Sequence, residues 1–229
     1  MLIGVHSTMN PLLLALLISV AAAADNYKIK NYFVKFHPNA TEKTFVVDQE
    51  SHFDVLGDVK EMKIKIGKNL EIDSVSVFTS KFIFRGNPDF IGLALKNDEY
   101  SYDKKTEILT VKLSEVNKKT ASEGAYVSIR YKGKIADEAT KGPIYVTKNG
   151  VIVADLKKDT HTIVPYVVPG KMKVGFHIVT GQKEKVEVKG LDAPGGFKHI
   201  DNWDETRTYY YSATKDGGFE QISFKISPQ

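Results

Sequence analysis

Hydrophobic and polar residues alternate along most of this chain with a period of two. Over residues 125–132 the odd positions hold Ala, Val, Ile and Tyr, whereas the even positions hold Tyr, Ser, Arg and Lys. This period is that of a β-strand with one buried face and one solvated face. Gly133 predicts the end of this strand, and Gly142 and Pro143 predict a turn before a further apolar segment at residues 144–145.

Segments of the same kind recur along the chain, separated by turn residues. The segments expected to be strands are residues 26–36 (with a shift in the alternation), 44–55, 62–66, 70–77, 108–113, 151–153, 162–168, 173–179, 185–188 and 208–213. Residues 80–97 add apolar positions at Phe82, Phe84 and Phe90. Turn signals predict a turn at residues 37–39 and a long loop at residues 190–204. Short strands at this spacing are typical of an all-β, antiparallel double-sheet, sandwich-like domain.

The first 24 residues have the pattern of a secretory signal peptide. An apolar run from Leu12 to Ala24 ends in four alanines, and a polar chain begins at Asp25. The run is shorter than the ~20 residues needed to span a bilayer. We therefore expect a cleaved signal, no membrane span, and a secreted, extracellular protein in which residues 25–229 form a single β domain.

Composition narrows the possible functions. Cysteine is absent, which excludes disulfides, thiolate metal ligands and a cysteine nucleophile. The net charge is +4, and lysines are mixed with acidic residues rather than clustered with aromatics, so we expect no nucleic-acid partner. The triplet Asn39-Ala40-Thr41 is an N-glycosylation sequon, and we expect Asn39 to carry sugar on a surface turn.

Candidate catalytic and metal-ligating residues are sparse. The histidines are isolated from one another, without the pair four residues apart that a helical zinc site uses. Asp201, Asp204 and Glu205 form the densest acidic group, which a solvated loop explains more simply than a calcium site. No Gly-x-Ser-x-Gly motif is present. We expect no catalytic residue, no metal and no cofactor.

Aromatic residues gather late in the chain, at Trp203, Tyr209, Tyr210 and Tyr211. In a strand with period two, Tyr209 and Tyr211 share one face and Tyr210 occupies the other. One interpretation is that these residues only pack the core. The other is that they form a surface for a partner, because Tyr and Trp bury large areas while keeping a polar tip.

Five segments of the chain follow one another in the order that they have in a known domain: residues 32–38, 45–55, 64–77, 102–113 and 124–133. In the same order, the first segment is a Tyr-rich strand that ends in Pro, and the second alternates from Phe to Val. The third has Ile-x-Ile followed by Leu-x-Ile, the fourth has Tyr-Asp before Glu-Ile-Leu, and the fifth has Gly-Ala-Tyr before Tyr-Lys-Gly. Together they resemble the N-terminal β domain of the aminopeptidase N family of zinc metallopeptidases. The resemblance implies a saddle-shaped, non-catalytic antiparallel domain.

The resemblance assigns no functional residue of the family to a position in this sequence. The family's chemistry lies in a later domain with Gly-Ala-Met-Glu-Asn and His-Glu-x-x-His motifs, and neither motif occurs in this sequence. Where the family has a Gln that lines the substrate pocket, this chain reads Val153-Ala154-Asp155. We therefore expect a secreted, non-catalytic module that binds an extracellular protein or peptide. Two alternatives are an auxiliary part of a zinc aminopeptidase and a carrier of a small molecule or lipid.

Overall fold

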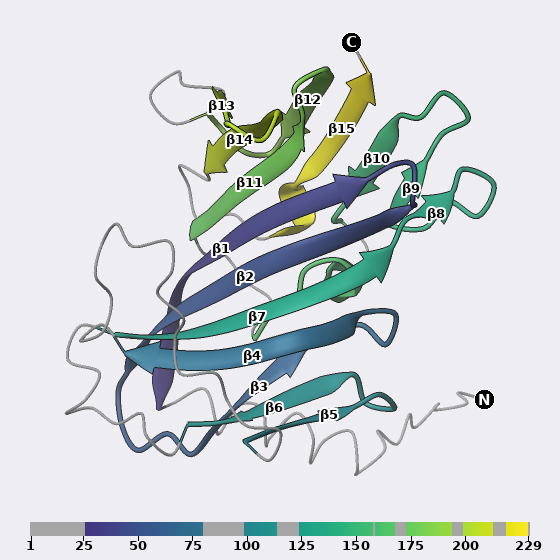
Figure 1. Cartoon of the computed structure of the whole chain (residues 1–229). Helices are drawn as coiled ribbons and strands as arrows, with labels where there is room; N and C mark the ends of the chain where they lie inside the picture. The colour runs from purple at the N-terminus through teal and green to yellow at the C-terminus, as the bar shows by residue number, and fades with distance from the viewer. Residues whose placement is uncertain are drawn as a thin grey trace, which may run out of the picture.

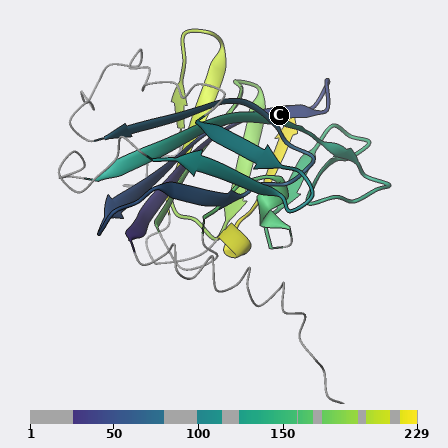
Figure 2. The same cartoon turned by 90° about the horizontal axis from the view of Figure 1, so that it is seen from below.

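The computed structural model describes residues 26–79, 99–113, 124–157, 159–167, 173–193, 199–212 and 219–228. Figures 1 and 2 show from two sides that strands dominate this part of the chain, and none of it forms an α-helix. Short 3-10 turns occur at η2 (Thr160–Thr162) and η4 (Phe219–Gln221). In these ranges we find no helix with the length and apolar character that crossing a membrane requires. The expected all-β fold is confirmed.

The largest sheet has seven strands. Its order is β13 (His199–Asp201), β14 (Thr206–Ser212), β11 (Lys173–Gly181), β1 (Tyr27–Asn39), β2 (Thr44–Val55), β7 (Ala125–Lys134) and β4 (Glu71–Thr79). Strand β1 shifts register against β2 between Ile29 and Asn31, which is the irregularity that its alternation predicts. Neighbouring strands are antiparallel except β1 and β11, which are parallel and come from opposite halves of the chain.

Two smaller sheets lie against the same core (Figure 1). One has the order β12 (Glu184–Lys189), β15 (Ser223–Pro228), β10 (Ile152–Asp155), β9 (Ile144–Val146) and β8 (Ala136–Asp137). The other has the order β3 (Glu61–Lys65), β6 (Ile108–Lys112) and β5 (Tyr100–Asp103). The sheets thus form the sandwich-like arrangement that the alternation predicts.

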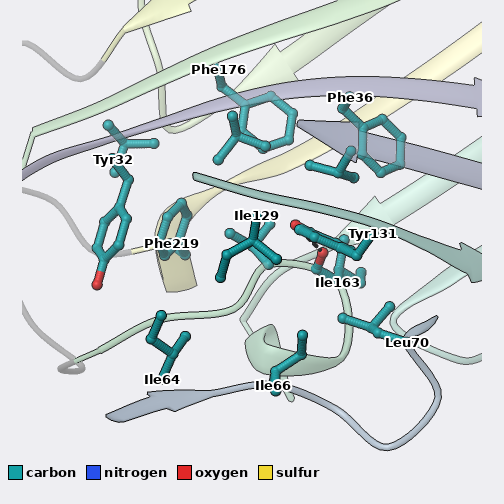
Figure 3. Close-up of a cluster of buried hydrophobic side chains, with 14 of the residues drawn as sticks. Tyr32, Phe36, Ile64, Ile66, Leu70, Ile129, Tyr131, Ile163, Phe176 and Phe219 are labelled. Atoms are coloured by element: carbon teal, nitrogen blue, oxygen red, sulfur yellow. Dashed lines mark hydrogen bonds between the residues drawn. The ribbon is translucent and has the colours of Figure 1, made fainter. Parts of the chain in front are cut away.

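One hydrophobic cluster joins the three sheets, and Figure 3 shows part of it. Phe36 of β1 packs against Phe45 of β2 at 5.2 Å, against Phe176 of β11 at 6.2 Å and against Phe224 of β15 at 5.3 Å between ring centroids. Such offset and edge contacts between aromatic rings add stability beyond the area that they bury. The inner face of the seven-stranded sheet is therefore packed in the core, whereas its outer face lies opposite the core.

A buried polar network ties the segment at residues 159–167 to the inner face of the large sheet. The Tyr131 hydroxyl lies 3.1 Å from Gln49 Oε1 and 3.0 Å from the Ile163 carbonyl oxygen, and it has one proton for these two acceptors. Gln49 Nε2 donates to the Pro165 carbonyl oxygen at 2.7 Å. Tyr131 and Gln49 are both fully buried, so these bonds satisfy groups that water does not reach.

The prediction that Gly133 ends its strand is wrong, because β7 continues to Lys134. A Cβ atom at Gly133 would lie 2.4 Å from Phe45 Cζ and 2.8 Å from Leu70 Cδ2. Glycine is present here because two core side chains fill the space above the strand. Local sequence cannot distinguish this use of glycine from a strand end.

Three other boundaries also differ from prediction. Strand β1 runs through residues 37–39 because its backbone still pairs with β2 there, so the turn follows Asn39. The segment at residues 162–167 is not a strand; it begins in η2 and meets β3 only through a bridge between Tyr166 and Lys65. The expected loop at 190–204 contains the short strand β13. The predicted apolar segment at residues 80–97 lies outside the described residues.

Candidate functional site

The outer face of the seven-stranded sheet, meaning the face opposite the core, carries partly buried aromatic and charged side chains. On β1 these are Phe33, Lys35 and His37, whose Cα partners on β2 are Glu50, Asp48 and Val46. The strand β1 alternates, so each of these residues follows a core residue and points away from it. All are intermediate in exposure. A sheet face of this composition combines apolar contact area with charge.

A pocket of about 470 Å³ opens on this face where β1, β11 and β14 adjoin. Its volume lies in the range of sites that hold a small molecule or a few residues of a peptide. Strand β1 contributes Phe33, Lys35 and His37, and β11 contributes His177 and Val179. The remaining walls come from β14 and from the turn that precedes it. Strands distant in the sequence thus build one site.

Aromatic rings form one wall of the pocket. The His177 ring stands edge-on to Phe33 at 4.4 Å and to Tyr210 at 4.3 Å between centroids. Gly175, opposite Phe33 on β11, makes room for this wall, because a Cβ atom there would lie 3.1 Å from Phe33 Cδ2. The rings therefore support one another and offer apolar surface to a ligand.

The two histidines of the pocket are held in the neutral form. Burial, and secondarily the charge of Lys35, lowers the pKa of His177 to about 4. Burial followed by Lys35 also lowers the pKa of His37. At neutral pH each imidazole therefore has one donor and one acceptor nitrogen, and Lys35 is the cationic residue in the described lining.

The polar wall is built from the turn between β13 and β14. Asn202 Nδ2 lies 2.9 Å from both Thr206 Oγ1 and Thr208 Oγ1. Asp204 Oδ1 accepts from the Thr206 hydroxyl at 2.5 Å and from the Thr206 amide at 3.2 Å. These bonds lower the pKa of Asp204, with the Thr206 hydroxyl the largest cause, so the carboxylate stays ionised.

Next to the pocket the outer face is charged. Arg130 Nη1 lies 3.1 Å from Asp48 Oδ1, so Asp48 is paired across β2 and β7. Burial, followed by the charge of Asp48, raises the pKa of Glu50. The outer face is therefore amphipathic, with aromatic rings at the pocket and an ion pair beside it.

The predicted aromatic surface residues fall in different environments. Tyr209 faces the core side, is nearly fully buried, and donates its hydroxyl to the Glu184 carbonyl oxygen at 2.7 Å. Tyr211 is partly buried and packs on the core, whereas Tyr210 lies on the outer face and lines the pocket. Trp203 is fully exposed in the turn between β13 and β14, between the pocket residues Asn202 and Asp204. The strand alternation at residues 209–211 is as the sequence predicts.

The acidic group near Trp203 is accounted for by the geometry of this hairpin. Asp201 forms two bonds with Arg207, from Nε at 2.5 Å and from Nη2 at 3.3 Å. Glu205 has a positive φ of 61°, which marks the turn. Among the described residues, His, Asp and Glu nowhere gather in a group of three or more that could hold a metal ion.

Asn39 is exposed at the end of β1. Its Oδ1 accepts from the Glu42 amide at 3.0 Å, and no described residue accepts a hydrogen bond from Nδ2, the atom that glycosylation modifies. The other described histidines have separate contacts: His52 stacks on Tyr126 at 4.3 Å, His161 Nε2 lies 3.2 Å from Glu107 Oε2, and the His199 ring lies 5.4 Å from that of Tyr209.

The sequence analysis did not predict the pocket, although it predicts most of the strands that form it. The alternation of β1 predicts that Phe33, Lys35 and His37 share the face opposite Tyr32, Val34 and Phe36. It does not predict that β11 lies beside β1, because the two are parallel and far apart in the chain. That pairing is what brings His177 to Lys35.

Comparison of the chain with protein-family models gave no match, and comparison with curated proteins gave none either.

Proposed function

We propose that this chain is a secreted, non-catalytic β module that binds a peptide or a segment of an extracellular protein on the outer face of its seven-stranded sheet. The pocket between β1, β11 and β14 carries this proposal. It combines an aromatic wall, a cation and hydrogen-bonding groups, and so offers both apolar contact and orientation to a ligand. The exposed Trp203 lies in the same turn, between the lining residues Asn202 and Asp204.

The proposal keeps the resemblance to the N-terminal β domain of the aminopeptidase N family. The order of the sequence segments from residue 32 to residue 133 supports it. In that family the domain lacks the catalytic motifs, which agrees with a binding role. An auxiliary role beside a catalytic chain would instead appear as co-purification with an aminopeptidase and a change in its activity.

Secretion and glycosylation belong to the same proposal. The pattern of residues 1–24 supports secretion, and the exposed side chain of Asn39 supports modification. Treatment of the secreted protein with a glycosidase is expected to increase its electrophoretic mobility. The variant Asn39→Gln is expected to migrate like the treated protein and to show no further change.

Selection from a displayed peptide library tests the binding function. Immobilised wild-type protein is expected to enrich peptides that no longer bind the double variant Phe33→Glu, Tyr210→Glu, in which two carboxylates replace the aromatic wall. The matched control is Lys225→Glu, an exposed change on β15 of the five-stranded sheet, which is expected to retain binding. Thermal melting confirms that each variant is folded. Equal binding by all three proteins would refute the proposed site.

A further inference from the structure

Lys35 lies within the pocket and forms no close ion pair with a described residue. Its neighbour on β2 is Asp48, whose Oδ1 pairs with Arg130 at 3.1 Å, and its neighbour on β11 is His177. In the part of the chain that the structure describes, no ion pair within 4.0 Å includes Lys35. A partly buried ammonium group gains most from an anion that enters the pocket.

The groups around Lys35 limit the charge that such an anion can carry. Asp204 is ionised at the polar wall, and its field reaches both Lys35 and His37. The pocket histidines are neutral at pH 7. Lys35 and Asp204 together carry no net charge, so a group with two negative charges would add both without compensation. A single carboxylate adds one, which lies beside Lys35 while an N–H donor of the same ligand faces Asp204.

The polar wall of the pocket can accept a hydrogen bond from a donor group of the ligand. Asn202 and the two threonines are bonded to one another, and Asp204 Oδ1 accepts two bonds from Thr206. Both Thr206 bonds to the Asp204 carboxylate go to Oδ1, and neither goes to Oδ2. This oxygen can accept from an N–H group of a ligand. The aromatic wall of Phe33, His177 and Tyr210 supplies apolar contact beside it.

We propose that the pocket anchors a bound peptide by one of its carboxylates, which pairs with Lys35 while an adjoining apolar side chain packs against Phe33 and Tyr210. An N–H of the peptide then donates to Asp204. This inference rests on the proposed peptide-binding function and specifies its ligand. The carboxylate has two sources in a peptide, the chain terminus and an internal Asp or Glu.

Three pools of peptides labelled with an uncharged BODIPY dye test this inference with the full mature chain. All are hexapeptides of randomised Gly, Ser, Ala and Phe, labelled at the amino terminus and ending in Leu. The first has a free terminal carboxylate, the second a terminal carboxamide, and the third a carboxamide and one internal Glu. Fluorescence anisotropy measures binding up to about 1 mM protein.

We expect the carboxamide pool without Glu to bind at least about tenfold more weakly than the better of the two carboxylate pools, as the loss of a charge-assisted bond implies. Preference for the first pool identifies the chain terminus, and preference for the third identifies an internal acid. Lys35→Gln is expected to weaken the better pool about tenfold or more, whereas Lys225→Gln leaves it unchanged. Circular dichroism verifies the fold of both variants.

Two results would overturn the inference, and they differ in what they say of the proposed function. If all pools bind equally and Lys35→Gln has no effect, the carboxylate anchor is wrong although peptide binding stands. If no pool binds at about 1 mM, both the proposed function and the anchor fail.

Discussion

Removal of one buried hydroxyl tests the role of the buried polar network, because the Tyr131 hydroxyl is one of the groups that link the large sheet to the segment at residues 159–167. The substitution Tyr131→Phe leaves the ring in place and removes the donor to Gln49 Oε1 and the Ile163 carbonyl. Within the described chain, Gln49 Oε1 then has no donor, and Gln49 is fully buried.

The expected cost follows from that unpaired acceptor. A buried polar group left without its partner costs about 1–3 kcal/mol, more than the net worth of an ordinary hydrogen bond. We therefore expect the free energy of unfolding to fall by about 2 kcal/mol. In a domain of this size that corresponds to a decrease in Tm of roughly 4–8 °C.

Urea unfolding followed by circular dichroism measures this change. The midpoint should fall while the slope against urea stays constant, since the surface exposed on unfolding is the same. The matched control is Tyr210→Phe, whose ring lines the pocket on the outer face rather than the core; its effect should stay within about 0.5 kcal/mol. Equal effects of the two substitutions would show that the buried network does not stabilise the fold.

Three further predictions follow from named contacts. Gly133→Ala should destabilise the fold by about 1–3 kcal/mol in urea unfolding, because its Cβ would lie 2.4 Å from Phe45 Cζ; an unchanged midpoint would contradict the packing. Since the pKa of His177 is lowered to about 4, the unfolded chain takes up a proton first as pH falls from 6.5, so stability is lost between pH 6.5 and 4. Solvent screening at this partly exposed ring reduces the loss in the free energy of unfolding to roughly 1–2 kcal/mol. The variant His177→Gln should lack this part of the pH dependence, and an unchanged pH dependence would show that His177 is not its source. The pKa of Glu107 is lowered to about 2, with the hydrogen bond from Lys65 as the largest cause. The wild type should therefore lose the stability that this pair contributes as the pH falls below 4.5, whereas Glu107→Gln, which already lacks the pair, should lose less stability in acid unfolding. Equal acid sensitivity of the two proteins would refute this assignment.

The alternation of residues predicts much of this fold because it depends on local geometry. Strand β2 spans residues 44–55 as predicted, and every second side chain of it is buried. Gly133 misled the prediction because its neighbours in space, Phe45 and Leu70, are distant in sequence. Strand β15 is absent from the prediction, although Phe224 and Ile226 alternate with polar residues, because so short a segment gives a weak period-two signal.

The candidate site was harder to predict than the fold, for a related reason. Its aromatic wall needs Phe33, His177 and Tyr210 on three adjacent strands, and the order of those strands is a property of the whole sheet. Histidines that are isolated in sequence therefore become neighbours, as His37 and His177 do in the pocket lining. Of the predicted aromatic residues, Tyr210 lines the pocket and Trp203 lies in the turn between two of its lining residues.

Binding of carboxylate-bearing peptides to wild type and to Lys35→Gln tests the central claim most directly. The measurement is fluorescence anisotropy with the free-acid, carboxamide and internal-Glu pools at neutral pH. The account predicts at least about tenfold tighter binding of a carboxylate pool by wild type, with this preference lost in Lys35→Gln and kept in Lys225→Gln. Equal binding of all pools by the three proteins would contradict it.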